Sequence, residues 1–185
     1  MNNYRQRAHN YFDHNAIGNS NVFFPLTVDR ARLYGWEVAV RSPRLFRRGE
    51  VYLAYANAHA QAAGAVSGGL TDFSPPDTGY FLLDQRHTLH AGLNLSLPGG
   101  VTAGSNIYYG SGFTDGSLDY PGHLRGHTTV DFSVGKSFRE RFTVSVTALN
   151  LANRKFLLDN STTFGGTHYA DPRQIYVQLR YRFHY

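Results

Sequence analysis

The final residues, 173–185, read Arg-Gln-Ile-Tyr-Val-Gln-Leu-Arg-Tyr-Arg-Phe-His-Tyr, and the character of their side chains alternates. Apolar and aromatic side chains take the odd positions from Ile175 to Tyr185, whereas the even positions are mostly polar or charged. Successive side chains of a strand point to opposite faces, so this pattern gives one apolar face and one polar face. A helix would scatter the same residues around its circumference. The segment is therefore predicted to be a β-strand.

The same period of two recurs upstream. Together with a poorly patterned first segment, it predicts strands within residues 3–12, 32–41, 51–55, 87–97, 101–109, 130–134, 142–148 and 173–185. Most of these segments run for about 9 to 13 residues, which is longer than a usual soluble strand and suits a tilted crossing of a bilayer. We therefore expect an all-β fold, an antiparallel meander of about eight long transmembrane strands.

The connections between these segments alternate between short and long. Tight turns are predicted at 98–100 and 139–141, and a moderately short one at 42–49. Long polar loops rich in Gly and Pro are predicted near residues 13–28, 60–84, 111–125 and 154–172. Outer-membrane barrels show this asymmetry, with short periplasmic turns and long outer loops. Eight strands would then place both chain ends on the periplasmic side.

The strands of a soluble β-sandwich or small barrel also alternate between apolar and polar residues, and this alternation alone does not show which face points inward. Strand length, the asymmetry of the loops and aromatic residues near the strand ends favour a membrane barrel. In that case Arg180, Arg182 and His184 should point into the lumen, because an Arg on the lipid face at mid-bilayer costs about 2–4 kcal/mol. No apolar run approaches the roughly 18 residues of a membrane helix, so a helical membrane protein is excluded.

Composition excludes several kinds of functional site. The chain has no Cys, so a disulfide, a thiolate metal site and a Cys nucleophile are impossible. Its net charge is +5, but the basic residues are spread along the chain rather than gathered in a stripe, which argues against nucleic-acid binding. The one basic cluster consists of Arg44, Arg47 and Arg48 and falls in a predicted turn. Exposure of these side chains to water is the favoured interpretation, and contact with lipid headgroups is the second.

The nine His residues invite a metal hypothesis, and His123 and His127 are four residues apart. That spacing forms a ligand pair on a helix, whereas these residues fall in a loop or strand, so we predict no metal site and no cofactor. His123, His127 and His168 lie in or beside predicted outer loops, where they could help to hold a chelate.

A catalytic barrel is a second functional class. Ser105, Ser133, Ser145, His90 and Asp131 fall on predicted strands, but no nucleophile-elbow motif surrounds a serine. These side chains are better explained as polar residues that line the lumen, so we predict no catalytic residue and no enzyme. Lipid hydrolysis that depends on one of these serines would favour this alternative.

Several stretches resemble the TonB-dependent outer-membrane receptors, in the order in which that family has them. Residues 126–136 resemble the strand before the final hairpin, and 147–156 resemble the penultimate strand, with an Asn-Leu-x-Asn run before a basic residue and an aromatic. Residues 172–185 resemble the closing strand. Weaker matches occur at 10–14, 33–37 and 84–89.

The resemblance implies that the chain is the C-terminal β-barrel portion of such a receptor. The family has a barrel of about 22 strands that is closed by a plug domain and powered through TonB. Tyr181, Phe183 and Tyr185 would face the membrane and form the terminal aromatic signal that the outer-membrane insertion machinery reads. The implied location is the outer membrane of a Gram-negative-type cell, and the implied activity is import of a scarce ligand such as a siderophore-type chelate.

The sequence also departs from the family pattern. It contains no plug domain and no TonB-engaging box, and Met1 to His9 has no apolar block that would indicate a signal peptide. We therefore expect one barrel segment over 1–185, a partial receptor that engages TonB only through N-terminal parts outside this sequence. The alternative is a small free-standing barrel for surface binding or anchoring, and the DNA upstream of Met1 would discriminate the two. The transported ligand, and whether eight strands close, stay open.

Overall fold

The structure is a computed structural model that describes residues 1–16, 23–42, 45, 47–68, 84–114, 122–139, 141–159 and 168–183. All of its regular elements are strands: β1 (Asn2–Ala16), β2 (Phe23–Arg41), β3 (Gly49–Gly68), β4 (His87–Leu97), β5 (Val101–Gly110), β6 (His127–Phe138), β7 (Phe142–Leu149), β8 (Leu157–Asp159), β9 (His168–Tyr169) and β10 (Gln174–Tyr181). Across these ranges, no helix is long and apolar enough to cross a membrane.

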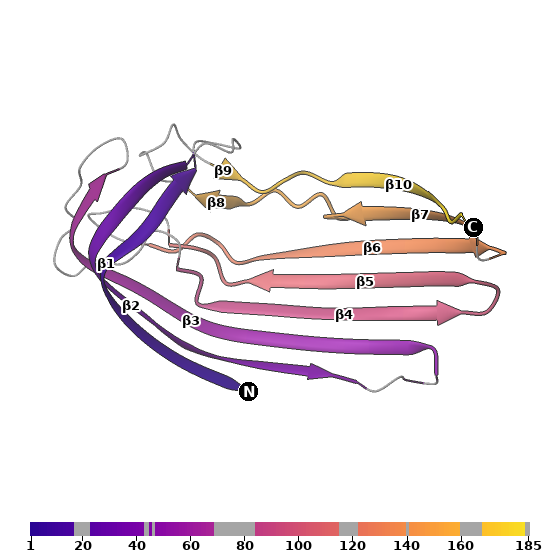
Figure 1. The fold of residues 1–185 in the computed structure, drawn as a ribbon, viewed down its shortest axis with the longest axis horizontal. Helices are drawn as coiled ribbons and strands as arrows, with labels where there is room; N and C mark the ends of the chain where they lie inside the picture. The colour runs from indigo at the N-terminus through magenta and orange to yellow at the C-terminus, as the bar shows by residue number, and fades with distance from the viewer. Residues whose placement is uncertain are drawn as a thin grey trace.

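Eight strands form one antiparallel sheet in the order β1-β2-β3-β4-β5-β6-β7-β10, so each strand lies beside its neighbour in sequence (Figure 1). Among the described residues, β8 and β9 come between β7 and β10 in the sequence and pair with each other in a separate small sheet. The predicted all-β meander of eight long strands is confirmed, and the terminal segment that alternates most clearly is β10.

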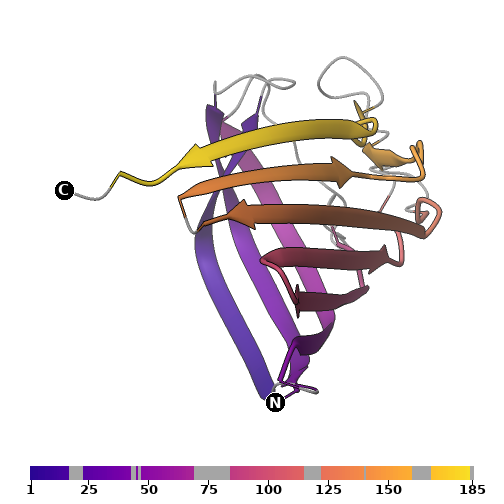
Figure 2. The ribbon, with the colours of Figure 1, turned by 90° about the vertical axis from the view of Figure 1, so that its right-hand side faces the viewer.

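The sheet is curved and open. Figure 2 shows it bent into a wall, with β1 and β10 as its two ends. Within the described ranges no pairing joins β1 to β10, so the eight strands do not close on one another. Each end strand therefore presents one row of unpaired backbone N–H and C=O groups, which a lipid environment cannot hydrate.

The short turns were predicted correctly, but some of the predicted loops are strand. Residues 98–100 and the segment between Phe138 and Phe142 connect paired neighbours, as expected. In contrast, β1, β2 and β3 are 15, 19 and 20 residues long and extend into the regions predicted as loops near 13–28 and 60–84. The predicted loop near 154–172 contains β8 and β9. Residues 17–22, 69–83, 115–121 and 160–167, at the centres of the predicted loops, lie outside the described residues.

Cross-strand register aligns the apolar side chains of successive strands on one face. One row runs from Val51 on β3 through Leu93, Ser105, Phe132 and Ala148 to Ile175 on β10, and the neighbouring rows are also mainly apolar. These side chains are exposed: 44% for Phe132 and 63% for Ile175. The buried apolar residues of the described chain are Val28, Ala31 and Ala62. A soluble sandwich would bury this face between two sheets, whereas here it is the exposed convex face of a single sheet.

The polar face is the concave one. Tyr52 of β3 reaches over β4 to bond Asn106 of β5, and such contacts between non-adjacent strands require side chains that converge inside the curve. Arg180 lies opposite Thr143 on this face, as predicted. Arg182 lies just beyond β10, and His184 is outside the described residues.

Candidate ligand-binding rim of the barrel wall

Gly92, near the middle of β4, lies on the concave face of the sheet. Register places Gly92 between Tyr52 and Asn106. The Tyr52 hydroxyl donates a hydrogen bond of 2.9 Å to Asn106 Oδ1. A methyl group at position 92 would overlap the Tyr52 ring, so glycine is what lets the phenol lie across the strand. The concave face is therefore polar here, with the Tyr52 side chain held across β4.

Towards the end with the long connections, aromatic and His rings form a continuous chain across three strands. His90 on β4 contacts Tyr108 on β5, with ring centroids 4.8 Å apart, and Tyr108 contacts His127 on β6 at 5.6 Å. His127 stacks on Phe156, with centroids 3.9 Å apart and planes 10° apart. Gln85, just before β4, donates a hydrogen bond of 2.6 Å from its Nε2 to the Tyr108 hydroxyl and so helps to hold this row of rings in place. The wall therefore ends in a packed aromatic rim.

Asn150 anchors the segment that carries Phe156. It follows β7, has a left-handed backbone conformation with φ of 47°, and is buried. Its N–H donates to Asp131 Oδ1 at 2.8 Å, and its side-chain amide donates to the carbonyl oxygens of Arg154 and Asp171. Its Oδ1 accepts from the Arg154 N–H at 2.9 Å. The Asn150 side chain thus joins the two ends of the β7–β10 connection, and its backbone N–H attaches them to Asp131 of the wall.

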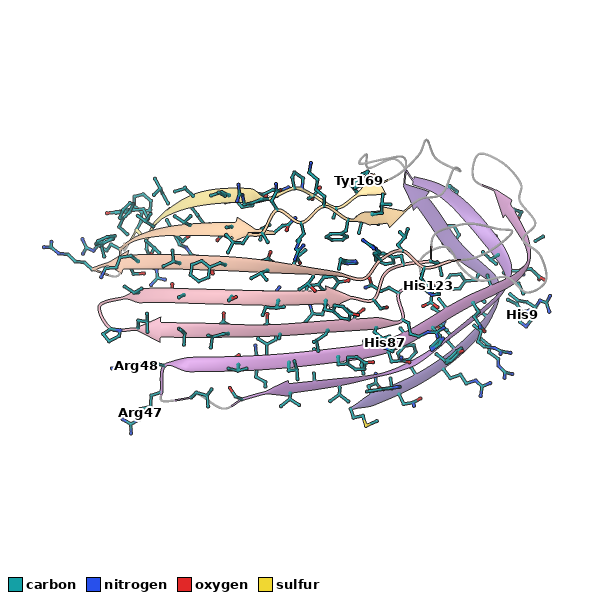
Figure 3. The ribbon with its side chains drawn as sticks, turned by 180° about the vertical axis from the view of Figure 1, so that it is seen from behind. His9, Arg47, Arg48, His87, His123 and Tyr169 are labelled. Carbon is teal, nitrogen blue, oxygen red and sulfur yellow. The ribbon has the colours of Figure 1, made fainter. Side chains whose placement is uncertain are left out.

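A cavity of about 730 Å³ opens beside this rim. It is lined by the 123–128 segment that leads into β6, by Arg154, Lys155, Phe156 and Leu157 after β7, and by Tyr169 of β9. Figure 3 shows His123 and Tyr169 at the end of the wall away from the short turn that carries Arg47 and Arg48. The cavity is thus formed by three chain segments that are distant in sequence.

The lining residues give the cavity a cationic and aromatic character. Arg125, Arg154 and Lys155 are exposed, and no acidic residue is among the lining residues. Phe156 and Tyr169 supply flat apolar surfaces. Guanidinium groups pair with planar oxyanions in a bidentate way, and aromatic faces stack on rings, so this combination suits an anionic ligand that contains aromatic rings.

The predicted rim histidines fall at this cavity to different extents. His123 and His127 both line it, His123 exposed and His127 buried beneath Phe156. His168 is the first residue of β9, next to Tyr169, and the placement of its side chain is not described. Arg125 and Tyr169 were not predicted from the sequence. The basic and aromatic residues at 154–156 carry part of the family resemblance and were not predicted to bind a ligand.

Asp84 lies at the same end, just before β4, and is buried to 6% exposure. Burial raises the pKa of its carboxyl above the usual value, and the nearby charges of His59 and Arg86 and a hydrogen bond from the Ala60 N–H oppose this shift. A buried carboxyl with cationic neighbours at the top of the wall is therefore sensitive to pH.

Two of the three aromatic residues expected to form the terminal signal lie within the described part of the chain. Tyr181 and Phe183 are 54% and 72% exposed, and their rings meet edge to face with centroids 4.7 Å apart. Tyr181 lies opposite Phe142, on the apolar face. Tyr185 lies outside the described residues.

The residues considered for catalysis are placed separately on the sheet. Asp131 accepts the Asn150 N–H, and His90 packs on Tyr108. Ser105 lies in an apolar row between Leu93 and Phe132, whereas Ser133 and Ser145 are on the polar face. Within the described part of the chain, no group of three or more His, Asp or Glu side chains is arranged to hold a metal ion.

Comparison with known structures identifies the architecture. The chain is similar to the ferric-catecholate import receptor Fiu of E. coli K12 in its closed form, at 14% identity and a TM-score of 0.67, over 98% of this chain and 24% of that one. It is similar to FpvA of P. aeruginosa bound to heterologous pyoverdines, at 11% identity and 0.66, over 97% and 24%. The siderophore receptor PiuA of Acinetobacter baumannii matches at 9% and 0.65, over 85% and 26%.

At these identities the likeness shows the fold, and the chain spans about a quarter of the length of each of these structures. The comparison with curated protein sequences gave no match. A family model described as the TonB-dependent receptor-like β-barrel matches residues 2–151, which is most of the chain. The chain belongs to the TonB-dependent receptor β-barrel family.

Proposed function

We propose that this chain forms part of the lipid-embedded wall of an outer-membrane receptor that imports a scarce ligand, a ferric chelate of the siderophore type. The observation that carries the proposal is the orientation of the sheet: its convex face is a broad apolar surface, and its concave face is polar. Exposed apolar surface of this extent needs a covering, and a bilayer covers such a face without a partner protein.

Ligand chemistry follows from the rim cavity. A ferric chelate built from catecholate groups is anionic and carries aromatic rings, which match the cations Arg125, Arg154 and Lys155 and the rings of Phe156 and Tyr169. The similar structures named above include receptors for a ferric catecholate and for pyoverdines. On this proposal His123 and His127 contribute to the rim around the ligand, with His168 beside it.

The same proposal covers location and partners. The receptor resides in the outer membrane of a Gram-negative-type cell, with lipid against the apolar face. The insertion machinery reads Tyr181, Phe183 and Tyr185 at the chain end, and TonB acts through parts of the receptor outside residues 1–185. The chain itself is a passive wall: it performs no catalysis and holds no cofactor.

Outer membranes purified from cells that make the protein test this proposal. An antibody against residues 168–185 should detect a band in the outer-membrane fraction, and the mobility of this band should change on boiling, because folded barrels resist detergent. A band well above the 20.7 kDa of this chain would identify these residues as part of a full receptor. A heat-modifiable band near 20.7 kDa would favour the free-standing barrel. Detection in the soluble fraction alone would refute both.

A further inference from the structure

The convex face changes character along β1 and β2. Val38 and Val40 belong to the apolar surface, and the next residues on the same face are Trp36 and Tyr34, followed by Arg32 and Arg30. The register is continuous from Arg30 to Arg41, so all of these side chains point to the convex side. The order from the middle of the wall towards its long-loop end is therefore apolar, aromatic and basic.

The neighbouring strand has the same order. Register places Asn3 opposite Trp36, Arg5 opposite Tyr34, Arg7 opposite Arg32 and His9 opposite Arg30. Arg5, Arg7, Arg30 and Arg32, the basic patch, are all exposed. Figure 3 shows His9 at the end of the molecule opposite Arg47 and Arg48.

The basic patch lacks internal neutralisation. Arg30 pairs with its neighbour Asp29, Nε to Oδ2, at 3.3 Å. Arg5, Arg7 and Arg32 form no ion pair within the part of the chain that the structure describes. Like charges directly opposite on neighbouring strands destabilise a sheet, and Arg7 and Arg32 are such a pair. A bound anion would relieve this repulsion.

The aromatic residues beneath the patch locate the membrane boundary. Trp36 packs on Tyr55 of β3 with ring centroids 5.1 Å apart, and Tyr34 stacks on His59 at 4.7 Å. Trp and Tyr gather at the membrane–water interface. Arg32 lies two residues beyond Tyr34, which is about 5 Å along the membrane normal for a strand tilted by about 45°. The headgroup layer is about 5–7 Å thick on each side of the hydrocarbon, so the guanidinium groups lie at the level of the headgroups.

A groove of about 440 Å³ on this surface joins the two regions. Its lining includes Arg5 and Arg32 together with the rings of Tyr34, Trp36 and His59. The geometry points to a binding site for the phosphate-bearing headgroup of a glycolipid in the outer leaflet, with phosphate between Arg5, Arg7 and Arg32 and the acyl chains along the aromatic and apolar surface below. This inference rests on the proposed placement of the wall in the membrane.

Lipid retention in nanodiscs tests the site. The protein as the cell makes it, purified from outer membranes, is incorporated into phosphatidylcholine nanodiscs that contain lipid A, a phosphorylated glycolipid, and the lipid A retained per protein is counted by native mass spectrometry. Because each arginine near a lipid surface contributes about 1 kcal/mol, about fivefold, Arg7→Gln/Arg32→Gln should weaken retention about 25-fold. Arg47→Gln/Arg48→Gln removes the same charge at the opposite end and should retain lipid A as the unmodified chain does.

Three further arms make the test decisive. Arg7→Lys/Arg32→Lys keeps the charge, so it should retain more lipid A than the Gln variant, and equal losses would overturn the phosphate site. Lipid A without its phosphates should bind the unmodified chain as weakly as the Gln variant binds lipid A itself. If inorganic phosphate displaces lipid A completely, the site holds a free anion and not a lipid headgroup, and the inference is wrong.

Failure of the proposed function gives a different result. A protein that, in the form the cell makes, does not enter the nanodiscs at all would contradict the membrane placement and with it this inference. A chain that enters and retains lipid A no better than phosphatidylcholine would refute the headgroup site alone.

Discussion

The hydroxyl of Tyr52 on β3 donates a hydrogen bond to the amide oxygen of Asn106 on β5 at 2.9 Å, across the strand that lies between them. Gly92 on that intervening strand leaves the space that the phenol occupies. The bond joins two strands that are not neighbours, which indicates that both side chains lie on the concave face of the sheet, and Gly92 is what lets the Tyr52 ring cross β4.

Replacing Gly92 with Ala should therefore destabilise the folded wall. Overpacking costs about 1–3 kcal/mol, which exceeds the roughly 0.4–1 kcal/mol that Gly→Ala contributes by restricting the unfolded chain. In a Tyr52→Ala background the overlap is gone, and the same substitution should be neutral or stabilising. Urea unfolding of the four proteins of this double-mutant cycle in lipid vesicles measures both effects. Equal losses in the two backgrounds would contradict the packing account.

Asn150→Asp should detach the β7–β10 connection from the wall. The substitution replaces the amide that donates to the carbonyl oxygens of Arg154 and Asp171 with a carboxylate oxygen, which cannot donate a hydrogen bond. Two lost hydrogen bonds at a buried site correspond to a loss on the order of 2–3 kcal/mol. Hydrogen exchange of residues 151–159 and 168–173 should then accelerate, whereas Asn2→Asp at the exposed start of β1 should leave these amides protected.

Asp84 should make the stability of the rim depend on pH. Its pKa in the folded protein is raised above that of the unfolded chain because burial disfavours the charged form. The folded state is therefore favoured most below the unfolded pKa, near 3.8, and loses this contribution as pH rises through the folded pKa. Asp84→Asn should abolish this part of the pH dependence of the unfolding free energy. An unchanged pH profile in the variant would show that other groups cause it.

The cations of the rim cavity should determine the affinity for an anionic chelate. Arg154→Gln/Lys155→Gln should weaken binding of a ferric tris-catecholate probe by about tenfold or more, since charge-assisted hydrogen bonds contribute about 1.5–3 kcal/mol each. Fluorescence quenching by the probe measures the affinity. Arg139→Gln/Arg141→Gln, at the far turn between β6 and β7, is the matched control and should bind the probe unchanged.

The sequence was sufficient to predict the two faces of the strands near the short turns but not where the strands end. Alternation is strong where the convex face is apolar and the concave face polar, as in β10 and β4. Towards the long connections β3 is rich in Ala, as around Ala60 and Ala62, so successive side chains no longer differ in character. The prediction of loops there was therefore wrong, and strands continue beyond the aromatic residues.

Much of the candidate rim could not be predicted for a different reason. Arg125, Phe156 and Tyr169 are far apart in sequence and meet through the small sheet of β8 and β9, for which two short segments give no periodic signal. The Asn-Leu-x-Asn run was recognisable as a family feature, but its physical role is visible in the structure alone. Asn150 and Asn153 both take positive φ, and Asn153 Oδ1 accepts the Arg173 N–H.

On the proposed placement, the even-numbered and mainly apolar residues of β6 face lipid, and the odd-numbered residues of the same strand face the polar side. The chain has no Cys, so single Cys substitutions can report on each face. Val134→Cys and Ser133→Cys are neighbours on β6, as are Val146→Cys and Ser145→Cys on β7. Each is labelled with a fluorophore in protein reconstituted in bilayers. Nitroxide-bearing lipids should quench the labels at 134 and 146 strongly and those at 133 and 145 weakly. Equal quenching at all four positions, or the reverse order, would contradict the membrane wall.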